Sequence, residues 1–230
     1  MASAAGVTVS WLARLEQGKA HAVSADVLDA LSRALDLDEL ERAHLFALAG
    51  LRLDASSVGL DEVPASVAML LHALEPCPAY VLDRAWNIVA WNASEAALFP
   101  PLTSTPKPNL LELVFLDERI RRLIVDHDAE SAHLVSQFRT HGTDWPGDRS
   151  IAEVVERLTA ASPDFARRWA AHDVAPLATT RRVFDHPRAG RLELDHQRLA
   201  VLDGAGMILV VYLDPPGGDS VARLAAAAEG

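Results

Sequence analysis

Five short strand patterns, widely separated along the chain, constrain its fold more than any other feature. Two of them, Ala79–Leu82 and Trp86–Trp91, lie upstream of a long helical region. The other three lie in residues 179–213 and read TTRRVFDH, RLELDHQRLAVL and MILVVYL. Hairpin turns are expected between them at Pro187–Gly190 and Asp203–Gly206. Because isolated hairpins of this length are marginal in water, we expect all five strands to pair in one antiparallel sheet, in an α+β fold.

Helical spacing of apolar residues accounts for most of the chain between the two groups of strands. The helices expected there are, in chain order, one from Pro64 to Leu74, one capped by Asn92 with Glu95, one from Asp117 to about Thr140, one over Ser150–Ala160, and one that begins at Ser162 and Pro163. On the last of these, Phe165, Trp169 and His172 recur at i, i+4 and i+7. This spacing predicts that the three side chains share one face.

The first 50 residues read as short helices separated by tight turns. Gly18 ends the first helix, Ser24 can cap the second, and Asp38 with Glu41 resembles the capping box of a third. Residues 51–61 have no period and contain Ser, Gly and Asp, so we place a linker there. The expected organisation is a helical segment over residues 1–50, the linker, a second domain over residues 62–215 and a C-terminal tail over residues 216–230.

The formal net charge of −11 argues against nucleic-acid binding over the whole surface, because phosphate attraction needs a local excess of Lys and Arg. Residues 1–20 hold Arg14 and Lys19 against Glu16, a net charge of +1. Residues 21–50 hold two basic and six acidic side chains. Any positive surface is therefore expected near the beginning of the chain.

Cys77 is the only cysteine, so it has no partner for an internal disulfide and cannot form a thiolate metal site alone. We expect a buried structural thiol and a reducing, cytoplasmic environment. The longest uninterrupted apolar run, Met207–Leu213, is far shorter than the roughly 20 residues of a membrane-spanning helix. The first residues also lack the pattern of a signal peptide, so no membrane partner is expected.

Sequence signatures of enzymes and metal sites are weak. The chain has no G-x-S-x-G elbow and no P-loop, and the glycines at positions 204 and 206 are better explained by a turn. His127 and His133 flank Glu130, but their spacing matches no common zinc site, and solvated helix positions are expected. His172 with Asp173 lacks an evident nucleophile. We therefore expect no catalysis, no metal and no cofactor.

Several motifs together resemble a known family of regulators. GVTVSWLARLEQG, SADVLDALSRALDL and ERAHLFALAG resemble the later part of an Xre-type helix-turn-helix domain. VLDRAWNIVAWNASEAALF, NLLELVF, SPDFARRWAAHDV and GRLELDHQRLAVL resemble the ligand-binding domain of MmyB-like transcription regulators. The resemblance covers nearly the whole chain in the same order. It implies a bacterial DNA-binding regulator whose second half has a PAS-like fold and holds a small apolar molecule, plausibly a fatty-acyl one.

Carried over to this sequence, the resemblance makes residues 8–17 the recognition helix, with Thr8, Ser10, Trp11 and Arg14 facing DNA. A helix of this kind enters the major groove, and its dimer binds a palindromic operator. The sequence departs from the family at its start, where residues 1–5 supply only the last turn of a second helix. We expect the true start to lie upstream, and weak DNA binding without that extension. A stand-alone sensor or protein-interaction module that has lost DNA binding is the alternative.

The same resemblance places the ligand between the sheet and its helices. The lining expected there is aromatic and consists of Trp91, Phe115, Phe138, Phe165 and Trp169. Asn92 and His172 are the polar groups that can orient a head group, and Arg168 can pair with a carboxylate. The alternative is that these aromatic side chains fill a dry core.

Overall fold

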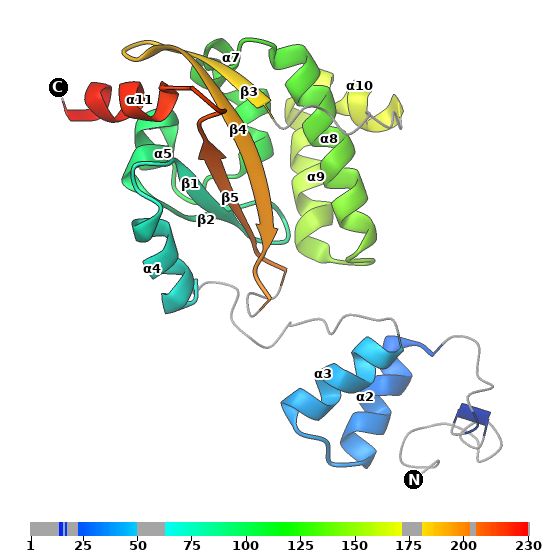
Figure 1. Cartoon of the computed structure of the whole chain (residues 1–230). Coiled ribbons are helices and arrows are strands. Elements are labelled where there is room, and N and C mark those ends of the chain that lie inside the picture. The colour runs from blue at the N-terminus through cyan, green and yellow to red at the C-terminus, as the bar shows by residue number, and fades with distance from the viewer. Residues whose placement is uncertain are drawn as a thin grey trace. The chain divides into compact units, whose positions relative to one another are not determined.

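The computed structural model describes residues 14–15, 17, 23–49, 63–171, 181–202 and 206–229. The chain divides into two compact units, Met1–Ser57 and Val58–Gly230 (Figure 1). The linker expected over residues 51–61 lies outside the described residues. Each unit is therefore described by itself.

The described part of the first unit contains a pair of helices, α2 (Ala25–Ala34) and α3 (Glu39–Leu48). The predicted capping box is present, because the Asp38 N–H donates to Glu41 at 3.0 Å and the Glu41 N–H donates to Asp38 at 2.8 Å. Ser24 occupies the cap position of α2, but its side chain accepts no capping hydrogen bond. The apolar side chains buried in this pair are Leu28, Leu31 and Phe46.

The second unit is built on one five-stranded antiparallel sheet, which confirms the predicted α+β fold. Its strands are β1 (Ala79–Leu82), β2 (Ile88–Trp91), β3 (Arg181–His186), β4 (Gly190–Ala200) and β5 (Ile208–Leu213). Their order across the sheet is β2-β1-β5-β4-β3. The last strand of the chain therefore pairs directly with β1, which lies about 130 residues upstream.

The second strand begins two residues later than its pattern suggested. Trp86 has a positive φ of 62° and lies in the turn after β1, where its N–H donates to the Asp83 carbonyl at 3.1 Å. The Asp83 side chain stabilises this turn by accepting from the N–H groups of Ala85 and Asn87. The interpretation of Trp86 as a strand residue is therefore wrong, and its indole is 1% exposed in the core.

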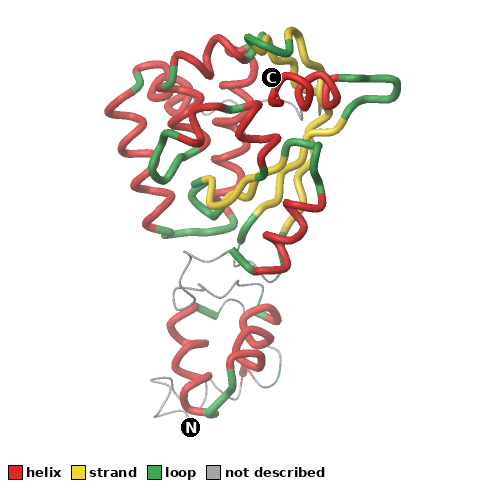
Figure 2. Tube along the Cα trace, turned by 90° about the vertical axis from the view of Figure 1, so that its left-hand side faces the viewer, coloured by secondary structure: helices red, strands yellow, loops and turns green. Residues whose placement is uncertain are grey.

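The helices of the second unit cover both faces of the sheet, as the two views show (Figures 1 and 2). In chain order they are α4 (Ala65–Ala73), α5 (Ala93–Leu98), the 3₁₀-helix η1 (Pro100–Thr103), α6 (Leu110–Leu116), α7 (Glu118–Leu123), α8 (His127–Thr143), α9 (Arg149–Ala161), α10 (Pro163–Ala171) and α11 (Ser220–Glu229).

The single helix expected from Asp117 to about Thr140 is in fact two helices, α7 and α8. The chain is extended between them because Ile124 forms a β-bridge with Phe184 and the Val125 N–H donates to the Val183 carbonyl at 3.1 Å. Pairing with β3 thus overrides the local helical preference of this segment. That break brings the first turn of α8 close to the edge strand β3.

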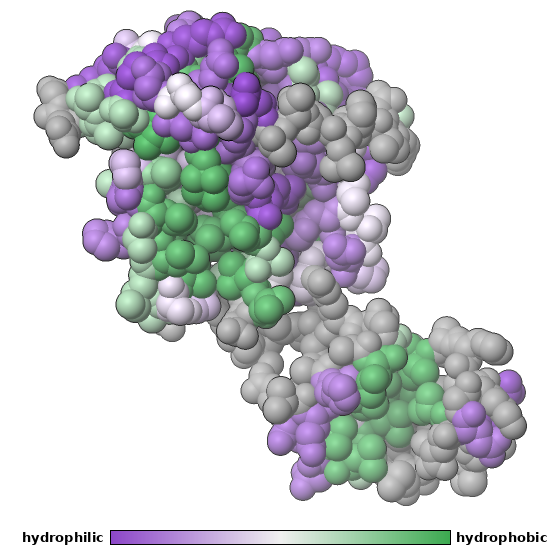
Figure 3. Space-filling model, in the orientation of Figure 1, coloured by the Kyte–Doolittle hydropathy of each residue, from purple (hydrophilic) through white to green (hydrophobic). Residues whose placement is uncertain are grey.

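The apolar clusters on the two faces of the sheet differ in size. The main core fills the face toward α5, α6 and α8–α10, whereas a smaller cluster around Val67, Leu71, Leu209 and Val211 lies on the opposite face beneath α4. Cys77 is half-buried between the two clusters and is a free thiol. On the α4 side the surface of this unit is largely apolar (Figure 3).

The segment expected to be a C-terminal tail contains the helix α11, which packs against α5 and β4. Val221 and Leu224 enter the main core. The Ser220 hydroxyl accepts a hydrogen bond from the Glu193 N–H at 2.9 Å, so the start of this helix is fixed to β4.

Candidate functional site

Four of the five aromatic residues predicted to line a ligand site lie together in the main core, on helices α6, α8 and α10. The rings of Phe115 and Phe165 are 5.2 Å apart, those of Phe165 and Trp169 stack at 5.7 Å, and Trp169 lies 6.3 Å from Phe138. Trp86 extends this aromatic cluster, because its ring lies 5.1 Å from Phe138. Trp86 was not predicted as a site residue, because the sequence pattern around it is typical of a strand.

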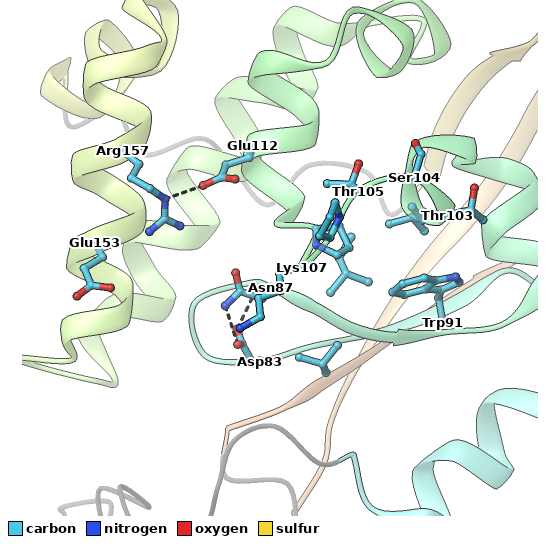
Figure 4. Close-up of a pocket in the computed structure, with 15 residues that line it drawn as sticks. Asp83, Asn87, Trp91, Thr103, Ser104, Thr105, Lys107, Glu112, Glu153 and Arg157 are labelled. Carbon is cyan, nitrogen blue, oxygen red and sulfur yellow. Dashed lines mark hydrogen bonds and ion pairs between the residues drawn. The ribbon is translucent and has the colours of Figure 1, made fainter.

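Trp91 lies elsewhere, in the wall of a pocket of about 1090 Å³ next to the edge strand β2 (Figure 4). This pocket is mostly polar. The Asn87 amide donates to Asp83 at 2.8 Å, and at the end away from Trp91 the Arg157 guanidinium pairs with Glu112 at 2.9 Å. These groups are already hydrogen-bonded within the protein, and the lining does not match the apolar site that was expected.

The predicted polar groups of the site have other partners. The buried Asn92 amide oxygen accepts from the N–H groups of Ala79 and Glu95, and its nitrogen donates to the carbonyls of Leu71 and Cys77. It therefore caps α5 as predicted, and its amide has little capacity left for a ligand.

Arg168 is also neutralised within the protein. Its guanidinium forms ion pairs with Asp128 of α8 and with Asp164 of its own helix α10. Two carboxylates thus compete with any anionic ligand for this cation. His172, the third polar group expected to orient a ligand, lies outside the described residues.

Polar side chains that were not predicted as site residues form a strip on the face of the sheet that carries the main core. This polar strip consists of Tyr80 of β1, Tyr212 of β5, and His196 and Arg198 of β4. The rings of Tyr80 and Tyr212 are 6.3 Å apart and that of His196 lies 5.4 Å from Tyr212. The alternation along β4 contained the signal, because His196 and Arg198 continue the even-numbered positions of its buried leucines.

Burial shifts the pKa values of one carboxyl group beside the polar strip and of one imidazole within it. Glu95 of α5 is 1% exposed, and burial raises the pKa of its carboxyl group well above the usual range. Burial lowers the pKa of His196 and, together with the positive charges of Arg182 and Arg198 nearby, brings it to about 3. The imidazole of His196 is therefore neutral near pH 7.

Helix α8 faces the polar strip with a row of polar side chains. The Arg198 guanidinium donates to the Gln137 amide oxygen at 2.8 Å, and the Gln137 nitrogen lies 2.6 Å from Nε2 of His133. One turn earlier, Glu130 pairs with Arg182 of β3 at 2.8 Å. The expectation that Glu130 and His133 are solvated is therefore wrong, because the break before α8 turns them toward the sheet.

Three buried polar atoms near this row have no hydrogen-bond partner in the structure of the described residues. They are Nε1 of Trp86, Oε2 of Glu95 and Nδ1 of His133. Buried polar atoms are nearly always satisfied by protein or water, so unpaired ones point to a bound molecule or ordered water. A pocket of about 390 Å³, lined by Glu130, Arg182 and others, reaches His133 from the surface.

Other kinds of site find little support. Within the described ranges, no group of three or more His, Cys, Asp or Glu side chains could hold a metal ion. No helix in the part of the chain that the structure describes is long and apolar enough to cross a membrane.

Of the residues predicted to contact DNA, only Arg14 is described. It is helical and exposed, and an exposed guanidinium can reach phosphate groups or base edges. Thr8, Ser10 and Trp11 lie outside the described residues.

Comparison with known families divides the chain at the same place as the structure. Residues 1–45 match the model of a helix-turn-helix domain, and residues 63–227 match the model of the MmyB-like transcription regulator ligand binding domain. A search among curated proteins found no match to the chain.

Proposed function

Because this chain belongs to the family of MmyB-like transcription regulators, we propose that it is a DNA-binding transcription factor controlled by a fatty acid bound in its second domain. The two family matches supply the two halves of a ligand-responsive regulator, and this architecture points to a protein that acts without catalysis. What we propose beyond these matches is that the ligand is a fatty acid and that its binding controls DNA binding.

The observation that carries the proposal is that an aromatic cluster and a polar strip meet inside the second unit. Trp86 lies where the two meet. Its ring contacts Phe138 of the aromatic cluster, and the Arg198 guanidinium of the polar strip lies 5.0 Å above the ring. An amphipathic ligand suits such a boundary. Each buried methylene group contributes about 0.8 kcal/mol, so a chain of a dozen carbons supplies ample affinity.

DNA recognition is assigned to the first unit. We place Thr8, Ser10, Trp11 and Arg14 against the major groove, where Arg can donate two hydrogen bonds to a guanine edge. Two copies then bind the halves of a palindromic operator, with half-sites about one helical turn apart. The bacterial, Xre-type and cytoplasmic character of the protein stays a prediction from its sequence.

The surface of α4 suits the contact between the two copies. Residues 63–74 contain no Asp, Glu, Lys or Arg, although the chain carries a net charge of −11. Met69 is 74% exposed and Leu70 is 45% exposed, so this helix presents apolar side chains away from the sheet as well as toward it. Two equally charged copies repel one another least across an uncharged face, and a self-complementary patch closes into a two-fold dimer.

Native mass spectrometry of the protein purified from cells, followed by lipid extraction, tests the ligand proposal. We expect a retained fatty-acyl mass that is lost in Trp169→Ala, which opens the aromatic cluster. Trp91→Ala removes a ring from the polar pocket beside β2 and serves as the matched control that keeps the ligand. A ligand-free mass, together with no thermal shift across a panel of fatty acids, would contradict the proposal.

A further inference from the structure

The polar pocket beside β2 differs from the aromatic cluster in both position and lining. Its volume is about 1090 Å³, and it shares no lining residue with the aromatic cluster or the polar strip. Trp91 and Arg157 lie at its two ends, and Lys107 lies between them (Figure 4). A pocket of this volume can hold a typical small ligand or cofactor. Its polar lining does not suit an apolar chain, because polar groups buried against hydrocarbon lose their hydrogen bonds with water.

All three carboxylates in this lining already have partners. The Asp83 carboxylate accepts hydrogen bonds from two backbone N–H groups and one side-chain amide of the turn after β1. Glu112 pairs with Arg157 at 2.9 Å, and Glu153 pairs with Arg149 at 2.9 Å. The negative charges of the pocket wall are therefore neutralised or hydrogen-bonded within the protein.

Lys107 is the remaining charged group of the wall. Among the described residues its ammonium group makes no ion pair and no hydrogen bond. Its φ is 52°, in the left-handed region that glycine adopts without cost and other residues rarely adopt. The loop is fixed to β2, because the carbonyl of the next residue, Pro108, accepts from the Ile88 N–H at 2.7 Å. A strained lysine with an unpaired charge, held in the wall of a pocket, indicates that its side chain has a function.

Three hydroxyl groups in the same wall can accept hydrogen bonds from a ligand but not donate to it. Those of Thr103, Ser104 and Thr105 donate to carbonyl groups of the protein, at 3.0, 3.2 and 2.8 Å. Since a hydroxyl has one hydrogen, only its lone pairs remain for a ligand. The ligand that suits this wall therefore carries hydrogen-bond donors, such as hydroxyl groups, as well as a negative charge for Lys107.

We propose that this pocket binds a nucleoside phosphate. The phosphate lies against Lys107, because a compact ammonium group is well suited to it. The ribose hydroxyl groups donate to the threonine and serine oxygens, and the base stacks on the Trp91 ring. An aromatic acid lacks the hydroxyl donors, and a sugar phosphate lacks the flat ring. The proposal does not depend on the fatty-acid ligand, because the two sites share no residue.

Isothermal titration calorimetry of the full-length protein with adenosine monophosphate (AMP), adenosine and ribose 5-phosphate tests the assignment. AMP should bind wild type at least about tenfold more tightly than either fragment, since each fragment lacks one of the two end contacts. Lys107→Gln should weaken AMP binding about tenfold and leave adenosine binding unchanged, because it removes the charge that pairs with the phosphate. Trp91→Leu should weaken the binding of AMP and adenosine but not that of ribose 5-phosphate.

Two controls accompany this titration. Arg122→Gln removes an exposed cation outside the pocket, which pairs with Glu118, and it should bind AMP as wild type does. Dodecanoate, a twelve-carbon fatty acid, should bind Lys107→Gln and wild type equally. The nucleotide site and the fatty-acid site are therefore tested independently.

Lys107→Gly distinguishes a ligand contact from a structural role. Glycine adopts the φ of 52° without strain, so the variant should keep or raise the melting temperature while losing the preference for AMP over adenosine. A lower melting temperature together with the lost preference would show that Lys107 supports the loop, and it would overturn the assignment. The inference is also overturned if AMP does not bind wild type, or if Lys107→Gln binds AMP as tightly as wild type does.

Discussion

At the scale of single residues, burial and partners distinguish side chains that hold the fold from those able to bind another molecule. Asn92 and Arg198 are both polar and both lie next to the main core. Asn92 makes four hydrogen bonds within the protein, whereas Arg198 makes one and carries a charge. We therefore assign Asn92 to the fold, whereas Arg198 keeps donors that could bind another molecule.

Asn92→Ala should lower the free energy of unfolding by about 3 kcal/mol, because it removes the cap of α5 and leaves buried N–H and carbonyl groups without partners. Urea unfolding measures this cost. Asp117→Ala removes the more exposed N-cap of α7 and should cost only about 1 kcal/mol. Equal costs for the two variants would mean that Asn92 is an ordinary cap, which would reopen its role in ligand binding.

Glu95→Gln should change how stability depends on pH. The pKa of Glu95 is raised in the folded protein, so the folded state keeps a proton that the unfolded chain releases above about pH 4.3. Glu95 therefore lowers the free energy of unfolding as the pH rises from about 4.3 toward the pKa that Glu95 has in the folded protein. Glutamine has no such titration, so the variant should gain stability relative to wild type between pH 5 and pH 8.

The test of this prediction uses the difference in unfolding free energy between the variant and wild type, measured at several pH values. His196 titrates in the opposite sense, since its lowered pKa costs stability as the pH falls below about 6.5. Taking the difference cancels this contribution. A difference that stays constant across the range would show that Glu95 is not desolvated in the folded protein.

At the scale of elements, Gly206, just before β5, lies against the connection between α8 and α9. Gly206 has a φ of 91°, and a Cβ atom there would lie 2.6 Å from side-chain atoms of both Arg84 and Trp145. The Arg84 guanidinium lies 4.8 Å above the Trp145 ring and pairs with Asp148 at 3.3 Å. The absence of a side chain at Gly206 thus allows its backbone to approach Arg84 and Trp145 closely.

Gly206→Ala should destabilise the protein by about 2–4 kcal/mol, because both the backbone strain and the overlap with Arg84 and Trp145 must be relieved. Gly217 has a similar φ of 80°, but open space surrounds its Cβ position. Gly217→Ala therefore measures the strain alone and should cost about 1 kcal/mol. Thermal unfolding of both variants gives the comparison, and similar costs would show that the close approach is absent.

The elements themselves were largely predictable from local patterns. Apolar patterns located all five strands to within two residues, and the capping residues Asp38 and Asn92 located two helix starts. What local patterns could not show was long-range pairing. The break between α7 and α8 depends on β3, which follows about 60 residues later. The positive φ of Trp86 likewise follows from the turn that Asp83 forms.

The candidate site was predictable only in part for the same reason. Aromatic residue types indicated the cluster of Phe115, Phe138, Phe165 and Trp169, because large aromatic side chains of helices usually point inward. Residue type could not tell Arg168 from Arg198. That distinction depends on which carboxylates the fold brings near each guanidinium, and Asp128 reaches Arg168 from another helix.

At the scale of the whole molecule, the account requires two copies to act on one operator. The uncharged surface of α4 is assigned to their contact. Met69→Glu should shift the protein from dimer to monomer in sedimentation velocity, since it places two like charges in an apolar contact. Leu116 of α6 is 49% exposed on another element, and Leu116→Glu should leave the dimer intact.

A wild-type protein that is monomeric at every concentration would contradict the dimer itself. If Met69→Glu and wild type dimerise equally, the contact lies on another surface. Neither result would affect the proposed ligand site or the proposed DNA contacts of the first unit, because other experiments test those.

DNA recognition gives a further prediction for the full-length protein. Arg14→Ala should remove the preference for operator over random DNA, with a loss of about 1–3 kcal/mol at the base that Arg14 contacts. Operator affinity of wild type should also fall steeply as the salt concentration rises. Unchanged discrimination in a gel-shift titration would exclude Arg14 from sequence readout.

The central claim is that a ligand in the second domain controls DNA binding by the first. Its most direct test is the affinity of the full-length protein for an operator selected from random DNA, measured by fluorescence anisotropy with and without dodecanoate. Control by the ligand predicts a change in dissociation constant of at least about fivefold for wild type, and no change for Trp169→Ala, which should not retain the ligand. An operator affinity that stays the same while dodecanoate is bound would contradict the claim.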